Sequence, residues 1–333
     1  MLRLTLRKKI SAFKSHPHLS SISHPQRRGS FILLRLSLCF FESEKIFSLF
    51  HVKHSILGLN FYIYVLYFYH KDERCGDMAK TVAIVNQKGG VGKTTTAVNL
   101  TAAVGASKKR ALLIDIDPQG NSTSGFGVNK RDVKITSYDV LTGEKKLSEA
   151  IIHTGFEGVD LVASNMNLAG AEIELIDLPN RERILKTAIA EVWQDYDFIF
   201  LDCPPSLGLI TLNALTAAET FLVPIQTEYY ALEGLSQLMA TVRRIKRLYN
   251  PYLELEGVLL TMYDGRLNLT QQVVEEIKKF FPRKVYASVI PRNVRLSEAP
   301  GFGKPVMYYD RRSAGTEAYS SLAAEFLKNN SSS

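Results

Sequence analysis

The stretch Lys88–Thr95, with the sequence KGGVGKTT, constrains the fold of this chain more than any other segment. It follows the β-branched run Thr81–Asn86 and precedes residues with helical apolar spacing, so it connects a strand to a helix. Glycines let backbone N–H groups turn inward around phosphate oxygens, and the start of a helix adds positive potential. The segment therefore predicts a phosphate-binding loop in an α/β fold with a parallel sheet.

Two side chains of this loop have expected roles in nucleotide binding. Lys93 would reach the β- and γ-phosphates, and the Thr94 hydroxyl would coordinate Mg²⁺, so ATP and Mg²⁺ are the expected cofactors. A glycine-rich turn that binds nothing is the alternative, and a Gly-Lys-Thr sequence in register after a strand argues against it. The residues assigned to ATP are Lys88, Gly89, Gly90, Val91, Gly92, Lys93, Thr94 and Thr95.

Acidic side chains lie at the ends of two further predicted strands, where an open α/β sheet forms its ligand sites. Asp115 and Asp117 are two residues apart and share one strand face. Asp202 ends the hydrophobic run Phe198–Asp202, which is a Walker B pattern, so its carboxylate would hold the Mg²⁺ shell. Such a carboxylate often only caps a helix, but the lysine-containing loop favours a magnesium site here.

The region from Met78 onward alternates short β-branched runs with helical segments, the pattern of βαβ units. The expected strands are Thr81–Asn86, Ala111–Ile116, Gly158–Ala163, Phe198–Asp202, Thr220–Ile225, Gly257–Met262 and Val285–Ile290. The expected helices are Asn180–Trp193, Leu232–Tyr249, Asn268–Phe280 and Ala314–Lys328. The pattern predicts one P-loop domain over residues 78–330, with a mostly parallel sheet flanked by helices on both faces, and a tail at 331–333.

The first 77 residues do not have the pattern of a domain. They hold 12 Lys/Arg against 5 Asp/Glu, which leaves 29 basic and 28 acidic residues in 78–333. The net charge of +8 therefore says little about what the domain binds. Three interpretations stay open: a transit peptide, a membrane span for which Ser55–Tyr69 is shorter than the roughly 20 residues required, and an untranslated or disordered segment with Met78 as the true start.

The three cysteines, Cys39, Cys75 and Cys203, fit neither a disulfide framework nor a CxxC metal site, so a reducing cytoplasm is expected. Cys203 is expected to be a small core residue at a strand end. Because the domain contains no second cysteine, it also lacks a ligand set for a bridging iron–sulfur cluster of the nitrogenase-reductase type.

The loop departs from the ordinary phosphate-binding pattern, because Gln87 replaces its first glycine and Lys88 is an additional lysine. KGGVGKT resembles the deviant Walker A motif of the ParA/MinD class of ATPases. The resemblance implies that Lys88 reaches across a dimer interface and stabilises charge developing on the partner's nucleotide. Asp117 is similar to the family's switch I aspartate, which positions the attacking water and helps organise Mg²⁺. The implied catalytic residues are Lys88, Lys93 and Asp117, and the implied metal ligands are Thr94, Asp117 and Asp202; Asp115 is expected to be structural.

Three more segments extend the resemblance over essentially all of 78–333, namely Ala169–Leu175, Glu228–Leu235 and Ile290–Pro300. Together they are similar to the short chromosomal ParA proteins called Soj. This family implies a homodimer that forms on ATP binding, binds DNA without sequence preference, and is released when a ParB-like protein bound at parS stimulates hydrolysis. It also implies a cytoplasmic, nucleoid-associated protein, with Pro291 and Asn293 against the adenine.

The resemblance also bears on the first 77 residues. Codons for Leu49–His54 can spell the palindrome TGTTTCACGTGAAACA, which resembles parS. We therefore hypothesise that this part of the sequence is a conceptual translation of an intergenic DNA site. Other codons at these positions in the DNA, or an N-terminal peptide from before Met78, would contradict the hypothesis.

The nearly neutral domain would need a local basic patch to bind DNA. Lys278–Arg312 contains nine basic and two acidic residues, and Arg243, Arg244, Lys246 and Arg247 form a second cluster. Runs of charged residues usually lie on solvent-exposed faces of a protein. The resemblance, however, singles out Arg266 and Arg295 as DNA-binding residues. A dimer would double the patch. Nothing resembles a helix-turn-helix module, so sequence-specific operator binding is not expected.

A MinD-like ATPase acting at a membrane, or a regulatory ATPase acting on a protein partner, is the alternative function. MinD-type proteins bind membrane through a C-terminal amphipathic helix. Here Ala318–Lys328 has one basic side chain and little bulk, so stable membrane association is not expected.

Overall fold

The computed structural model describes residues 79–228 and 231–331. The interpretations of residues 1–77, including the codons for 49–54, concern a part of the chain outside these ranges. Every element described below belongs to the unit Gly76–Ser333.

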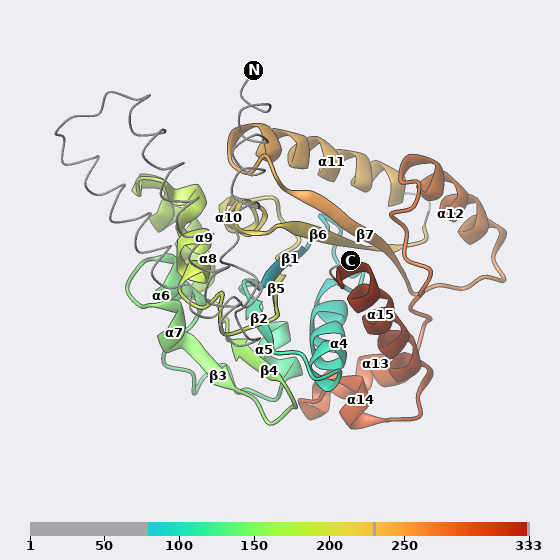
Figure 1. Ribbon diagram of the computed structural model, residues 1–333, viewed down its shortest axis with the longest axis horizontal. Helices are drawn as coiled ribbons and strands as arrows, with labels where there is room; N and C mark the ends of the chain where they lie inside the picture. The colour runs from blue at the N-terminus through green and yellow to red at the C-terminus, as the bar shows by residue number, and fades with distance from the viewer. Residues whose placement is uncertain (1–78, 229–230, 332–333) are drawn as a thin grey trace, which may run out of the picture. The chain divides into compact units, whose positions relative to one another are not determined.

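A seven-stranded sheet with the order β3-β4-β2-β5-β1-β6-β7 forms the centre of this unit (Figure 1). Its strands are β1 (Lys80–Ile84), β2 (Ala111–Asp115), β3 (Ile151–His153), β4 (Val159–Val162), β5 (Phe198–Asp202), β6 (Thr220–Gln226) and β7 (Glu254–Thr261). Every neighbouring pair is parallel except β3 with β4. Since β1 lies between β5 and β6, the carboxyl end of β1 is next to that of β5, and the loops that follow these strands meet there.

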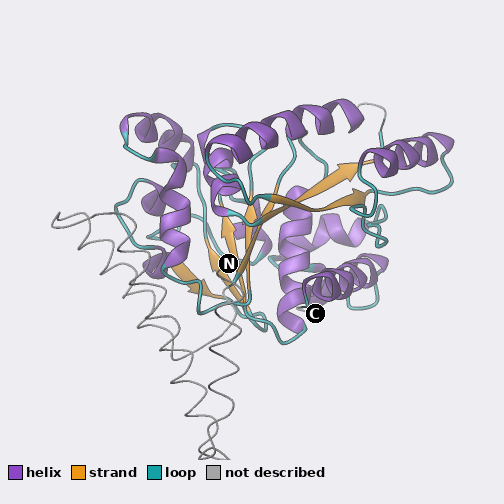
Figure 2. Ribbon diagram, turned by 45° about the horizontal axis from the view of Figure 1, so that its top comes forward, coloured by secondary structure: helices purple, strands orange, loops and turns teal. Residues whose placement is uncertain are grey.

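Successive residues of the strands enter two separate hydrophobic cores, one on each face of the sheet. Ala83 and Leu112 belong to one core, and Val82 and Leu113 belong to the other. Figure 2 shows helices on both faces. The first core is covered by α9 (Ile184–Ala190), α10 (Leu209–Ala217), α11 (Ala231–Leu248) and α12 (Asn268–Phe280), and the second by α4 (Lys93–Ala106) and α15 (Ala314–Asn330). The sequence-based expectation of a doubly covered, mostly parallel sheet is confirmed.

Short helices complete the described unit. They are α5 (Asn121–Gly125), α6 (Ser137–Leu141), α7 (Leu147–Ala150), α8 (Leu168–Glu174), η2 (Leu175–Asp177), η3 (Arg181–Arg183), α13 (Val294–Glu298), η4 (Ala299–Phe302) and α14 (Val306–Tyr309). None of the helices between residues 79 and 331 that the structure describes combines the length and hydropathy required to cross a membrane.

One predicted strand, Val285–Ile290, is wrong. The segment makes isolated contacts with β7 and no continuous ladder: Tyr286 N–H donates to Val258 O at 3.0 Å, Val258 N–H donates to Lys284 O at 2.7 Å, and Ile290 N–H donates to Leu260 O at 2.9 Å. Between these points, the N–H groups of Ala287 and Ser288 donate to the Glu325 carboxylate, each at 2.8 Å. A side chain from α15 thus takes the hydrogen bonds that a strand would give to its neighbour.

The predicted helix Asn180–Trp193 is also too long. Asn180 has a left-handed backbone with φ 56°, and the first turn after it is the 3₁₀ segment η3, so α9 begins only at Ile184. The strand β3 was not predicted, because a strand of three residues at the edge of a sheet is too short to show an alternating pattern.

Candidate functional site

The predicted phosphate-binding loop connects β1 to α4, as expected. Gly90 and Gly92 have positive φ angles of 75° and 86°, which residues with a Cβ adopt only with strain. Gly92 directly precedes α4, and its carbonyl accepts the N–H of Thr96 at 2.9 Å. The first N–H groups of the helix therefore face the loop, where they can bind phosphate oxygens.

Two residues that the sequence analysis missed hold the loop in shape. Asn86 Oδ1 accepts the N–H of Lys88 at 3.0 Å, while its Nδ2 donates to Pro224 O on β6 at 2.7 Å. Thr261 Oγ1, at the end of β7, donates to Val91 O at 2.8 Å. The only signal in the sequence is that each is a polar residue ending a hydrophobic strand.

Lys93 is almost fully buried at the start of α4, with 7% of its surface exposed. Its Nζ donates to Lys88 O at 3.1 Å, so the ammonium points back into the loop. Burial lowers the pKa of Lys93, and the nearby carboxylates of Asp202 and Asp117 act in the opposite direction. A phosphate would supply the missing counter-charge at this position.

Asp202 is completely buried at the end of β5. Its Oδ2 accepts the Ser122 hydroxyl at 2.7 Å, whereas its Oδ1 has no hydrogen-bond partner among the described residues. Burial raises the pKa of Asp202, and hydrogen bonds from Ser122 and Thr94 lower it. A buried carboxylate oxygen without a partner is costly, and a hydrated metal ion would satisfy it.

These residues fit a magnesium ion. Asp202 and Thr94 offer hard oxygen donors, and Asp117, which is 7% exposed, acts electrostatically on both Asp202 and Lys93. In the described parts of the chain, no group of three or more His, Cys, Asp or Glu side chains could hold a metal alone. Mg²⁺ is commonly held by one or two protein ligands together with water and nucleotide phosphates.

Asp115 and Asp117 follow the same strand, but their carboxylates make different contacts. Its Oδ1 accepts the N–H of Asp117 at 3.1 Å, and its Oδ2 accepts the N–H and hydroxyl of Thr123 at 2.8 and 2.7 Å. Burial and the charge of Asp202 raise the pKa of Asp115. These bonds tie the loop after β2 to α5, which supports the structural role expected for Asp115.

The carboxylate of Asp117 is held by its own turn. Its Oδ1 accepts the N–H of Gln119 at 2.9 Å, and its carbonyl accepts the N–H of Gly120 at 2.8 Å.

Cys203, beside Asp202, is fully buried in the first core, as predicted, and burial raises the pKa of its thiol.

A cavity of about 500 Å³ lies beside the loop, between its helical end and the segment after Ile290. Gly92 and Thr95 line one side, and Pro291 and Asn293 line the other, so the structure places both predicted adenine-binding residues next to the loop. Asn293 Oδ1 accepts the N–H of Arg295 at 2.9 Å and caps α13. The cavity is therefore bounded on this side by a fixed turn.

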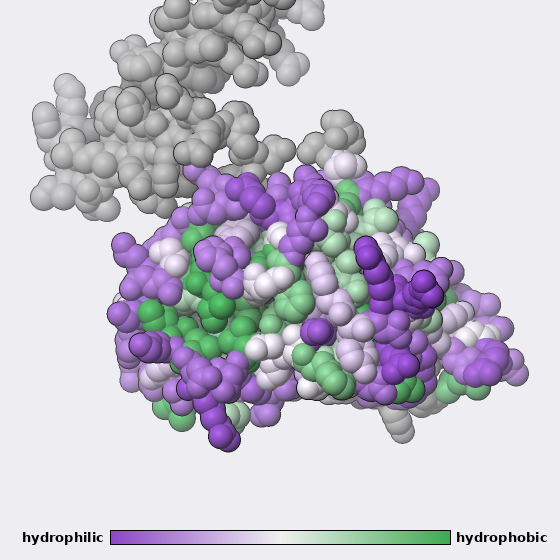
Figure 3. Space-filling view, turned by 90° about the horizontal axis from the view of Figure 1, so that it is seen from below, coloured by the Kyte–Doolittle hydropathy of each residue, from purple (hydrophilic) through white to green (hydrophobic). Residues whose placement is uncertain are grey.

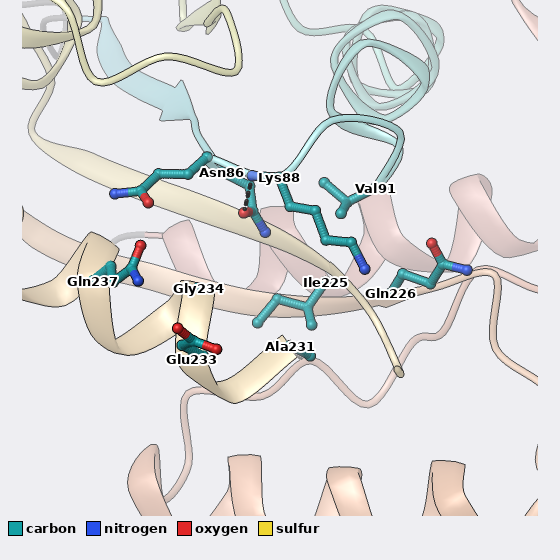
Figure 4. Close-up of a pocket in the computed structure, with 10 residues that line it drawn as sticks. Asn86, Lys88, Val91, Ile225, Gln226, Ala231, Glu233, Gly234 and Gln237 are labelled. Carbon is teal, nitrogen blue, oxygen red and sulfur yellow. Dashed lines mark hydrogen bonds between the residues drawn. The ribbon is translucent and has the colours of Figure 1, made fainter. Parts of the chain in front are cut away.

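Lys88 points away from its own loop. Its Nζ lies 2.5 Å from Oε2 of Glu228, and its side chain lines a second pocket formed with Ile225 on β6 and Gln237 on α11 (Figure 4). Lys93, not Lys88, fills the loop of the same chain. The described chain thus has one lysine directed into its own site and one directed outward.

The two arginines predicted to bind DNA lie on surface segments after β7 and on α13. The Arg266 side chain is 89% exposed and the Arg295 side chain is 49% exposed. Neither forms a described hydrogen bond with the phosphate-binding loop, and each forms ion pairs with neighbouring carboxylates.

The fold and this loop define the class of protein, which is a P-loop ATPase that uses ATP and Mg²⁺. A family model described as "AAA domain" matches residues 79–255. The chain is 56% identical over 252 residues to the sporulation initiation inhibitor protein Soj of Bacillus subtilis, which covers 76% of this chain and 100% of that protein. It is 48% identical over 251 residues to the chromosome partitioning protein ParA of Myxococcus xanthus, covering 75% of this chain and 89% of the relative.

A solved structure of cobyrinic acid a,c-diamide synthase from Mycobacterium smegmatis, with bound ADP and magnesium, is similar in fold. It has a TM-score of 0.66 and 36% sequence identity, and the match covers 75% of this chain and 95% of that one. The matches to the family model and to the relatives above show that the chain belongs to the ParA/Soj family of chromosome-partitioning ATPases.

Proposed function

We propose that this partitioning ATPase works as an ATP-gated homodimer in which Lys88 completes the site of the partner. The observation that carries the proposal is the direction of the two loop lysines. Lys93 is buried against the loop, whereas Lys88 lines a separate pocket and pairs with Glu228. A lysine that does not serve its own nucleotide can stabilise charge on another one once its exposed ion pair opens.

The dimer that forms on ATP binding would bind DNA without sequence preference. Arg266 and Arg295 are exposed and belong to segments that adjoin the cavity beside the loop. Phosphate contacts add across a dimer, so two chains would bind DNA far more tightly than one, with a strong dependence on salt. A ParB-like partner would stimulate hydrolysis, separate the chains and release them, and the protein would be associated with the nucleoid in the cytoplasm.

The MinD-like alternative is less well supported. The apolar face of α15 packs in the second core, where Tyr319, Leu322 and Phe326 are at most 2% exposed. A helix that uses its apolar face in the core cannot also place that face in a membrane. This favours DNA as the partner and argues against stable membrane association.

Co-sedimentation with random-sequence duplex DNA tests the proposal. Binding should require ATP and Mg²⁺, decline steeply with salt, and disappear in Lys88→Ala, which should still bind ATP as a single chain. DNA binding that is equal with and without ATP would contradict the gating, and ATP-dependent binding to vesicles in place of DNA would favour the MinD-like alternative.

A further inference from the structure

Each arginine of the proposed DNA surface is held by carboxylates of its own chain. The Arg266 guanidinium makes a two-pronged contact with Asp264, with Nε–Oδ1 at 2.8 Å and Nη2–Oδ2 at 2.7 Å. Arg295 contacts Glu298 through Nη1 at 2.7 Å and Asp310 through Nε at 3.1 Å. We call these contacts the carboxylate clasps.

The clasps neutralise the two arginines. Three carboxylates contact them, so an approaching phosphate would have to displace a carboxylate to reach either guanidinium. The hydrogen bonds from Arg266 hold the pKa of Asp264 at about 2, so this carboxylate stays charged. The planar fork of arginine binds one carboxylate or one phosphate in the same way, and the two therefore compete for it.

Exposed ion pairs also occur elsewhere on the described surface, for example Lys108 with Glu157 and Lys279 with Glu276, but not in every basic cluster. Arg243, Arg244, Lys246 and Arg247 on α11 form no ion pair with any residue that the structure describes. Figure 3 shows one face of the molecule, with hydrophobic residues gathered on its left-hand side and many hydrophilic residues on its right-hand side. The clasps therefore distinguish Arg266 and Arg295 from the basic cluster on α11.

Both clasps adjoin the cavity beside the phosphate-binding loop. Met262, two residues before Asp264, lines the cavity, and the N–H of Tyr263 donates to Ile290 O at 2.9 Å. Leu296 of α13, next to Arg295, lines the cavity from the other side. A base bound there would touch the two segments that carry the clasps.

We propose that Asp264, Glu298 and Asp310 mask Arg266 and Arg295, and thereby keep a single chain off DNA. The proposal rests on the DNA-binding function proposed above. Exposed ion pairs are weak and are screened by salt, so DNA phosphates presented to two chains at once can open the clasps. A single chain therefore does not bind DNA, whereas a dimer makes enough phosphate contacts to displace the carboxylates.

The test is Asp264→Asn, which removes the charge but keeps an oxygen to accept the N–H of Arg266, a bond of 3.1 Å in this structure. Affinity for random duplex DNA is measured by fluorescence anisotropy in a slowly hydrolysed ATP analogue with Mg²⁺, over a range of salt concentrations. We expect binding to tighten by about 1.5- to 5-fold per chain, or about 2- to 25-fold for a dimer. Glu298→Gln should have a smaller effect, since Asp310 still holds Arg295.

Asp177→Asn is the matched control, because it makes the same charge change at an exposed aspartate on η2 that forms no described ion pair. Its DNA affinity should equal that of the unmodified protein. Combining Asp264→Asn with Arg266→Glu should remove the gain, because there is then no arginine to unmask.

Several outcomes would overturn the mask. Unchanged or weaker binding by Asp264→Asn, while Arg266→Glu still weakens binding, would show that Asp264 orients Arg266 and does not mask it. An equal gain in Asp177→Asn would show a general charge effect. If the unmodified protein binds no DNA, or Arg266→Glu binds normally, the proposed DNA function of this surface fails, and the mask fails with it.

Discussion

The nucleotide end of the sheet and the arginine surface both depend on charged side chains, but they hold them in opposite ways. Lys93, at the start of α4, and Asp115 and Asp202, at the ends of β2 and β5, are at most 7% exposed and are fixed by hydrogen bonds. Arg266 and Arg295 remain largely in water, in ion pairs that salt and phosphates can replace. Substitutions at the nucleotide end should therefore affect ATP hydrolysis and the stability of the fold, and substitutions at the arginine surface should affect only DNA binding.

The largest effect is expected from Lys93→Ala. This change removes the only loop ammonium that points into the loop of its own chain and leaves Asp202 and Asp117 without their nearest described cation. ATP binding, measured by isothermal titration, should be undetectable, and hydrolysis should fall by about 1,000-fold or more. Lys328→Ala, at an exposed end of α15, is the control; substantial ATP binding by Lys93→Ala would contradict the assignment.

Asp117→Ala should separate binding from hydrolysis. The loop, Lys93 and Asp202 stay in place, so ATP should still bind, while hydrolysis slows by about 100-fold or more because the water is no longer positioned. Size-exclusion chromatography with ATP should then show a persistent dimer. Normal turnover would remove Asp117 from the catalytic residues and leave only its role in the turn.

Asp115→Asn should lower stability more than it lowers nucleotide affinity. In this variant an NH₂ group replaces one of the two carboxylate oxygens. Whichever oxygen it replaces, it faces at least one buried donor and leaves that donor without an acceptor; the three donors are the N–H and hydroxyl of Thr123 and the N–H of Asp117. A loss of about 1–3 kcal/mol in the free energy of unfolding is expected, measured by urea denaturation without nucleotide. The exposed Asp177→Asn should unfold like the unmodified protein, and equal stability of Asp115→Asn would refute the structural role.

The smallest effect on the folded protein is expected from Arg266→Glu. The side chain is exposed, so the urea midpoint and ATP-dependent dimerisation should not change. The salt dependence of DNA binding should lose about one unit of slope per chain, because one phosphate contact is gone. DNA affinity and salt slope equal to those of the unmodified protein would clear Arg266, and a loss of stability would contradict the distinction between the two regions.

Local patterns predicted much of the fold and the place of the phosphate-binding loop in it. β5 and α12 have the bounds expected from their apolar spacing, and the glycines, lysines and aspartates of the nucleotide end lie where their positions after strands indicated. These features are local, since a strand end and the loop after it are set by residues close together in the chain. The DNA-binding role of the arginines came from family resemblance and stays a prediction.

Contacts between distant segments decided the rest. Val285–Ile290 has the composition of a strand, but Glu325, almost forty residues away, takes its N–H groups. The strand order, the support of the loop by Asn86 and Thr261, and the clasp of Asp310 on Arg295 likewise require residues that are far apart in the chain. The sequence by itself determined which chemical groups end the strands; only the tertiary structure decided which of them are buried, which are paired and which face outward, because those properties depend on the neighbours that folding brings together.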